Sequence, residues 1–172
     1  MASKKRKKKE EEYYEIIREK LSKLFKEKGV NVYLEVTSRG VFSNKLKSKI
    51  PRGKEIILLF LRKVAPDITG FVEGTVLPGF IVVEVKGSKI ELDDIYQLKK
   101  YADLFEARFA FLVSLEPIPV EIKRLQEVLY LLTKLKCGII YHAFVLTHFD
   151  RNNKEFVEWF NENPFISSIY WR

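Results

Sequence analysis

The chain has 172 residues, which is enough for one domain with a sizeable core and too few for two. Its formal net charge of +8 favours a polyanionic partner, but six of these positive charges lie in residues 4–9, which leaves +2 for the remainder. The single cysteine, Cys137, excludes an intramolecular disulfide and a four-cysteine metal or iron–sulfur site.

Residues 1–9 are expected to form a disordered basic tail, because a run of like charges repels itself and buries nothing. The tail either adds non-specific attraction to phosphates or is a solvated leader. Residues 10–172 are expected to form a single domain. The sequence shows no signal peptide and no apolar run long enough to span a bilayer, so we expect a cytoplasmic protein that does not bind membranes.

The first third of the chain predicts a helix, a strand and a basic loop. Residues 10–28 carry apolar side chains at three- and four-residue spacings before Gly29, which indicates an amphipathic helix. Residues 31–37 alternate as a strand does. Residues 38–54 are polar and basic, which suits contacts to a nucleic-acid backbone or an ordinary surface loop. Residues 55–64 are strongly apolar, and we favour a strand over a short helix.

The rest of the chain alternates between predicted strands and helices. Two strands joined by a loop are expected in residues 65–86. The later elements expected are a helix at 92–105, a strand at 109–114, a helix at 120–136, a strand at 139–146 and a helix at 153–161. The aromatic residues 165–172 either close the core or bury a homodimer interface.

Charged residues end the second strand of the 65–86 segment. Glu84 and Lys86 follow four apolar residues and point to the same side, because residues two apart on a strand share a face. Folding the two strands together places Asp67 opposite Glu84 or Val85, and one of these registers sets Asp67 beside Glu84. Two carboxylates and an ammonium at one sheet edge suit a hard divalent cation and an activated water. The alternative is a strand-end ion pair and a turn aspartate after proline.

This segment resembles the PD-(D/E)XK nuclease signature, with Pro66-Asp67, a hairpin and then Glu84-Val85-Lys86. The family's core order is helix, three strands, helix, strand, and residues 10–114, about two thirds of the chain, can be read in that order. The resemblance implies an α/β fold with a restriction endonuclease-like core, in which helices flank a central mixed sheet of four to five strands.

The resemblance also assigns roles in the site. Asp67, Glu84 and the backbone carbonyl of Val85 would hold Mg²⁺, with Mn²⁺ as a substitute. Lys86 would orient or deprotonate the attacking water, or neutralise the transition state. Gln97 would reach the site from the following helix, or else lie on the surface.

In this family a glutamate of the first helix often joins the site. Glu15 is favoured because it is mid-helix and flanks the apolar stripe, although each candidate could equally be solvated. The candidates are Glu10, Glu11, Glu12, Glu15 and Glu19.

Three functions remain open. The first is a magnesium-dependent endonuclease acting on DNA, with branched DNA as one substrate, as for a Holliday junction resolvase; cutting at paired positions would need a homodimer. The second is a nuclease-like fold that binds nucleic acid or a partner without cutting. The third is an unrelated α/β domain whose basic tail does the binding.

Overall fold

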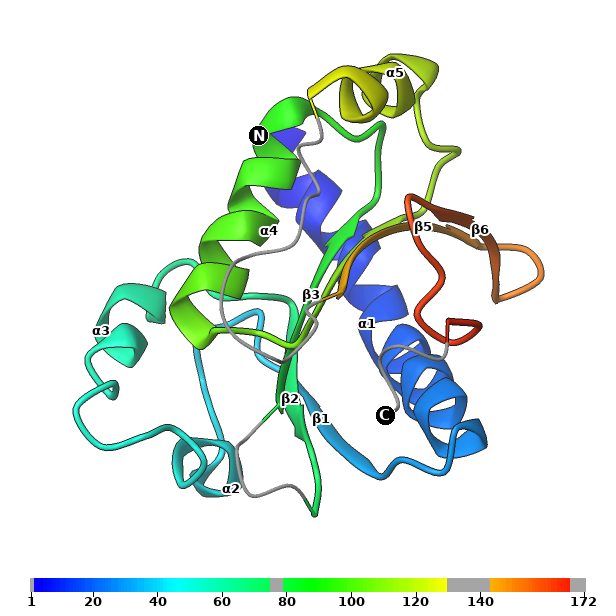
Figure 1. The fold of residues 1–172 in the computed structure, drawn as a ribbon. Coiled ribbons are helices and arrows are strands. Elements are labelled where there is room, and N and C mark those ends of the chain that lie inside the picture. Colours follow the sequence, from blue (N-terminus) through cyan, green and yellow to red (C-terminus); the bar gives the residue numbers. More distant parts are fainter. Residues whose placement is uncertain (1, 75–78, 130–142, 168–172) are drawn as a thin grey trace.

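The computed structural model describes residues 2–74, 79–129 and 143–167. They form an α/β fold in which helices flank one mixed sheet of six strands, in the order β1-β2-β3-β4-β5-β6 (Figure 1). The strands are β1 Val32–Val36, β2 Ile68–Val72, β3 Gly79–Lys86, β4 Phe109–Ser114, β5 Ala143–Asp150 and β6 Glu155–Phe160. The helices are α1 Ala2–Glu27, α2 Asn44–Lys47, α3 Ile57–Leu61, α4 Leu92–Phe105 and α5 Val120–Leu129.

The sheet has an antiparallel half and a parallel half. Strands β1, β2 and β3 form an antiparallel meander, β3, β4 and β5 run parallel, and β6 returns antiparallel to β5. Helix α4 is the crossover that the parallel pair β3 and β4 requires. The amino end of α4 therefore lies close to the carboxyl end of β3, where the predicted charged residues sit.

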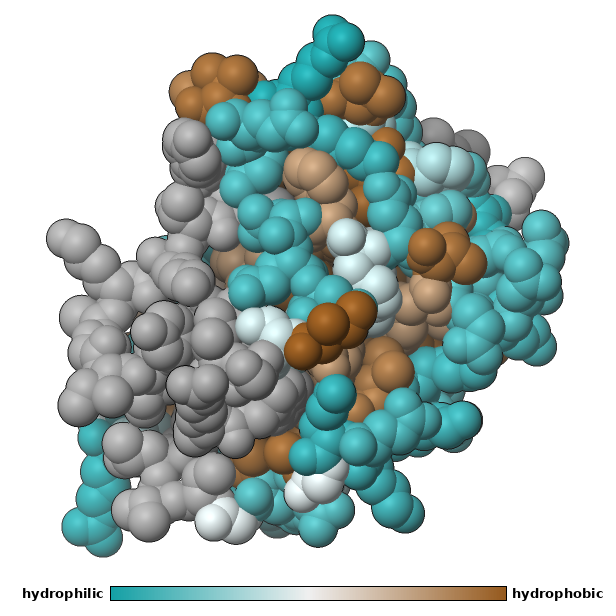
Figure 2. All heavy atoms as spheres, turned by 45° about the vertical axis from the view of Figure 1, so that its right-hand side comes forward, coloured by the Kyte–Doolittle hydropathy of each residue, from teal (hydrophilic) through white to brown (hydrophobic). Residues whose placement is uncertain are grey.

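The core has two layers, one on each face of the sheet. Helix α1 packs on one face and α4 on the other (Figure 1). Every residue of β4 is buried, as expected for a parallel strand covered on both faces. No helix in the described residues is long and apolar enough to cross a membrane. On the face shown in Figure 2, hydrophobic residues form small patches separated by hydrophilic ones.

Helix α1 confirms the amphipathic pattern but begins earlier than expected. Tyr14, Ile17, Leu21 and Phe25 are buried along one stripe of the helix. The helix is described from Ala2, whereas the sequence predicted its start at residue 10. Lysine and arginine are good helix formers, and a packed helix that is already nucleated extends at little cost.

Two predicted elements are wrong. Residues 55–64 contain helix α3 instead of a strand; Leu61 is the buried residue of that helix, while Phe60 faces solvent. Residues 153–161 contain strand β6 instead of a helix, because Lys154 adopts a left-handed conformation in a turn that folds the chain back onto β5. This additional strand explains why the sheet has six strands rather than four to five.

Parts of three other predictions fall outside the described residues. Helix α5 is described to Leu129, and the predicted strand at 139–146 is described from Ala143, where it continues to Asp150. In the aromatic end of the chain, the Phe165 ring lies 5.0 Å from that of Phe25, so this residue closes the core next to α1. Residues 168–172 lie outside the described part.

Candidate functional site

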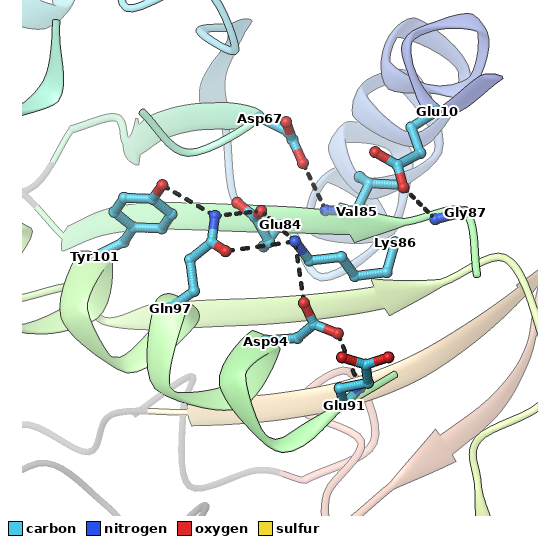
Figure 3. A network of polar contacts seen from close by, with 10 residues as sticks. All are labelled: Glu10, Asp67, Glu84, Val85, Lys86, Gly87, Glu91, Asp94, Gln97 and Tyr101. Atoms are coloured by element: carbon cyan, nitrogen blue, oxygen red, sulfur yellow. Dashed lines mark hydrogen bonds and ion pairs between the residues drawn. The ribbon is translucent and has the colours of Figure 1, made fainter. Parts of the chain in front are cut away.

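The register of β2 and β3 brings the two predicted acids together. Ile68 pairs with Val83, so Asp67, one residue before β2, lies across from Glu84. Residues opposite each other on paired strands share a face. Both side chains are buried, at 5% and 4% exposure, at the carboxyl end of β3 (Figure 3). Of the two registers that the sequence leaves open, the structure adopts the one that forms a site.

Asp67 is held by backbone groups on both sides. Its Oδ2 accepts a hydrogen bond from the Val85 amide at 2.8 Å, and its own carbonyl accepts one from the Thr37 amide at 2.8 Å. The Thr37 hydroxyl donates to the Pro66 carbonyl at 2.7 Å and lies 2.8 Å from the Thr69 hydroxyl. Thr37 therefore fixes the backbone that carries the Asp67 carboxylate.

Replacing Thr37 with valine tests this support. Thr37→Val should lower the free energy of unfolding by about 1–3 kcal/mol, because it leaves buried oxygen atoms without a partner. Thr147→Val is the matched control, since the buried Thr147 hydroxyl donates to the Glu158 carbonyl at 2.7 Å on the far side of the sheet. Chemical denaturation should show a similar loss for both variants, and calorimetry should show weaker Mn²⁺ binding for Thr37→Val alone. Equal Mn²⁺ affinities would contradict the role given to Thr37.

Glu84 has one satisfied and one unsatisfied oxygen. Its Oε1 accepts a hydrogen bond from Gln97 Nε2 at 2.7 Å and lies 3.0 Å from Lys86 Nζ. Its Oε2 is buried and has no hydrogen-bond partner among the described residues. A buried carboxylate oxygen without a partner is costly, and a bound cation would satisfy it.

Lys86 bridges the strand and the helix. Its ammonium lies 3.0 Å from Glu84 Oε1 and 3.2 Å from Asp94 Oδ1, and it donates a longer bond to Gln97 Oε1 at 3.4 Å. Burial alone lowers the pKa of Lys86, but the negative charges of Glu84 and Asp94 outweigh it and raise the pKa overall. The side chain is therefore a fixed positive charge in the metal-free protein, which argues against its acting as a base there.

Helix α4 supplies two residues from its first turns. Asp94 belongs to the capping box that starts the helix, where its Oδ2 accepts from the Glu91 amide at 2.8 Å. Gln97 lines the same cavity as Asp67 and Glu84, and its Nε2 also contacts the Tyr101 hydroxyl at 3.2 Å. Asp94 and Gln97 are three residues apart and so share a helix face. Asp94 is not among the site residues predicted from the sequence, which missed its contact with Lys86.

The glutamate that α1 contributes is Glu10, not Glu15. Glu10 Oε1 accepts a hydrogen bond from the Gly87 amide at 2.8 Å (Figure 3). A Cβ on Gly87 would lie 2.7 Å from Glu10 Cγ, so glycine allows this approach. Glu15 instead pairs with Arg18 at 2.6 Å and lines a different cavity. Glu10 precedes Tyr14 by four residues and thus continues the buried stripe, a spacing that the sequence already contained.

These side chains line a cavity of about 250 Å³. Its volume is sufficient for several water molecules, each of which occupies roughly 30 Å³. Carboxylates outnumber cations in its wall, so the cavity attracts positive charge. The lining residues are Glu10, Val64, Ala65, Asp67, Glu84, Lys86, Ser88, Glu91, Asp94 and Gln97.

The oxygen atoms in the cavity fit a hard cation. Within the described residues, no three histidine, cysteine or acidic side chains cluster closely enough to hold a metal by themselves. Asp67 and Glu84 offer two carboxylates. The Val85 amide points at Asp67, and the amide and carbonyl of one strand residue lie on the same side, so the Val85 carbonyl faces that side too. Two carboxylates, a carbonyl and water suit Mg²⁺, which usually retains several waters.

The two acids are destabilised as charged groups. Burial raises the pKa of Asp67 to about 6. Burial, together with the charge of Asp67, raises the pKa of Glu84 to about 8. A cation between the two carboxylates would offset both effects.

The raised pKa values predict how stability depends on pH. The folded metal-free protein retains protons on Asp67 and Glu84 that the unfolded chain loses near pH 4. The free energy of unfolding contributed by these groups should therefore fall as pH rises from about 4 to about 8. Urea denaturation at pH 5 and pH 8 with a chelator measures the change, and the Asp67→Asn/Glu84→Gln double variant is the control. Wild type and double variant with the same pH dependence would contradict the prediction.

Comparison of the chain with protein-family models, with curated proteins and with solved structures finds no match.

Proposed function

We propose that this chain is a metal-dependent endonuclease of the PD-(D/E)XK type that hydrolyses phosphodiester bonds in DNA. One observation supports this most directly. Asp67 and Glu84 lie side by side at the end of β3, and a buried oxygen of Glu84 has no hydrogen-bond partner in the described part of the chain. Lys86 lies on the same face, and the cavity opens at this point. Apart from the short helices α2 and α3 between β1 and β2, the elements from α1 to β4 follow the order that the resemblance implies.

Each side chain has a role in this reaction. Asp67, Glu84 and the Val85 carbonyl would hold Mg²⁺, or Mn²⁺ in its place. The bound metal would polarise the phosphodiester and stabilise the negative charge that develops on it. Lys86, held protonated by Glu84 and Asp94, adds a second positive charge for the transition state and orients water.

Gln97 and Glu10 position these groups. Gln97 contacts both Glu84 and Lys86, so it fixes their relative orientation. Glu10 is anchored on the Gly87 amide through Oε1, and its second oxygen would accept a hydrogen bond from water.

A selectivity for branched DNA is part of the proposal. A four-way junction is cut at paired positions, which requires two copies of the site and therefore a homodimer.

The acidic cavity makes the metal essential for approach of a phosphate, because carboxylates would otherwise repel it.

A second candidate function is binding of nucleic acid by an inactive nuclease-like fold. The specific observation in its favour is that Lys86 already neutralises Glu84 Oε1 and Asp94. In such a module the ion pairs would replace the metal, and the site would have only a structural role.

A cleavage screen separates the two functions. Labelled single-stranded, duplex, flap and four-way DNA are incubated with the full chain and Mg²⁺ or Mn²⁺. We expect metal-dependent cutting, fastest on the four-way substrate. Binding without cutting in either metal would leave the inactive module, and neither binding nor cutting would overturn both functions.

Glu10 and Glu15 form a matched pair for testing the first helix. Glu10→Gln should lower the cleavage rate by about tenfold to a hundredfold, the range typical for groups that support a metal site. Glu15→Gln should leave the rate unchanged, because Glu15 contacts Arg18 outside the cavity. Initial rates under saturating Mg²⁺ provide the measurement. A larger loss from Glu15→Gln than from Glu10→Gln would return the role to the residue favoured by the sequence.

A further inference from the structure

A short helix beside the cavity exposes both apolar and basic side chains. Phe60 is 72% exposed, and Ile56, Leu59 and Val64 are about half exposed, although all four are apolar. Arg62 and Lys63, which follow the helix, are also exposed. Large exposed apolar groups that lie together mark interaction sites. The α3 surface is defined as Ile56, Leu59, Phe60, Arg62, Lys63 and Val64.

The backbone beneath the α3 surface is fixed. Leu61 is 1% exposed and anchors the helix in the core, where Ile57 and Leu58 also pack. Gly40 approaches so closely that a Cβ there would lie 2.4 Å from the Arg62 carbonyl oxygen. The exposed side chains therefore project from a backbone held in place on two sides.

The α3 surface is continuous with the cavity. Val64 belongs to the surface and also lines the cavity, as does the next residue, Ala65. Asp67 follows two residues later. The chain between Phe60 and Asp67 spans seven residues, so the two lie at most about 25 Å apart. A polymer bound on the α3 surface could thus lead directly into the site.

The charges of the α3 surface are available to a partner. Within the described residues, neither Arg62 nor Lys63 forms an ion pair with a carboxylate. Lys54, earlier in the same segment, is by contrast paired with Glu106 at 2.5 Å. Proteins bind single-stranded nucleic acid through cations that contact its phosphates and aromatic rings on which its bases stack.

We propose that the α3 surface binds a single-stranded segment of DNA leading into the cavity, with a base stacked on Phe60 and phosphates on Arg62 and Lys63. This inference rests on the proposed function. A second protein copy fits less well, because interface centres are depleted in charge and burying two unpaired cations is costly. A matched duplex fits less well too, because its bases are already stacked and offer no face to Phe60.

Binding without cutting tests the surface. Fluorescence anisotropy measures the affinity of the full chain, in Ca²⁺ and without Mg²⁺, for a labelled 20-nucleotide single strand and for the same strand in a duplex. Phe60→Leu keeps an apolar side chain but removes the ring, and it should weaken single-strand binding about tenfold while sparing the duplex. Arg62→Gln/Lys63→Gln should reduce the slope of log affinity against log salt by about 1.4 for the single strand.

Matched variants away from the surface serve as controls. Tyr96→Leu removes another exposed aromatic ring, on α4 beside Lys99. Lys26→Gln/Lys28→Gln removes two exposed cations at the opposite end of α1 from Glu10. Neither control should reproduce the effect of the corresponding α3-surface variant.

Several results would overturn the inference. If Phe60→Leu leaves single-strand binding intact, or weakens duplex binding equally, stacking on this ring is excluded. Sedimentation showing a dimer that Phe60→Leu dissociates would make the surface a contact between copies. If the wild type cleaves DNA but Phe60→Leu does not weaken single-strand binding, this inference is wrong and the proposed nuclease function stands. If single-strand binding depends on Phe60 but no metal supports cleavage, this inference stands and the proposed nuclease function is wrong.

Discussion

Asp67→Asn and Glu84→Gln should each lower the rate of DNA cleavage by at least about a thousandfold. Each substitution removes one carboxylate from the pair that would hold the metal, and a metal's stabilisation of transition-state charge is worth several kcal/mol, at about 1.4 kcal/mol per tenfold in rate. Single-turnover rates on the best substrate of the screen measure the loss. Calorimetric titration with Mn²⁺ should show weaker binding in both variants.

The same two variants should be more stable than the wild type at pH 8 without metal. Burial destabilises the charged carboxylates of Asp67 and Glu84 and so raises their pKa values. A neutral amide in the same place has no charge to bury. Glu19→Gln is the control, since this side chain is exposed and pairs weakly with Arg18 at 3.5 Å. A variant that lost activity because it misfolded would show lower stability, which would count against a metal-ligand role. Retained cleavage in either variant would remove the proposed site altogether.

The parts of the fold that the sequence predicts well are those with one clear period. The stripe Tyr14, Ile17, Leu21 and Phe25 defines helix α1, and the apolar strand β4 reads correctly because both of its faces are buried. The prediction of a strand at residues 55–64 fails because a run of six consecutive apolar residues shows neither a helical nor a strand period. In the structure half of that run, Ile56, Leu59 and Phe60, is exposed, and composition alone cannot reveal this.

The prediction of a helix at residues 153–161, where the structure has strand β6, fails for the opposite reason. Phe156, Trp159 and Phe160 recur at three- and four-residue spacings, which predicts a helix. The free edge of β5 decides otherwise, since aromatic residues also favour strands and a partner strand supplies the backbone hydrogen bonds. Tertiary pairing thus overrides a local pattern, as it commonly does for short segments.

The site follows from the sequence only in part. The spacing of Glu84 and Lys86 places them on one face, but the pairing of Asp67 with Glu84 depends on a register that a one-residue slip would reverse. Glu10 could have been selected over Glu15 by extending the buried stripe upstream by one turn. The contact of Asp94 with Lys86 could not have been predicted from the sequence, because it depends on where α4 packs against β3.

Lys86→Met should affect cleavage and metal binding in opposite directions. The methionine keeps the length of the side chain but removes the charge that stabilises the transition state and orients water, so cleavage should fall by about a hundredfold to ten-thousandfold. The Lys86 ammonium lies 3.0 Å from Glu84 Oε1, where it repels an incoming cation. Its removal should therefore tighten Mn²⁺ binding, measured by calorimetry beside single-turnover cleavage.

The opposed directions distinguish a catalytic lysine from a structural one. If Lys86 only completed an ion pair with Glu84 and Asp94, its loss would leave buried carboxylates uncompensated, and stability, metal binding and cleavage would all fall together. Lys89→Met is the control, because Lys89 is exposed and pairs with Glu121 at 3.6 Å away from the cavity. Tighter Mn²⁺ binding with unchanged cleavage would show that Lys86 modulates the cation alone, and the catalytic charge would then have to come from another residue.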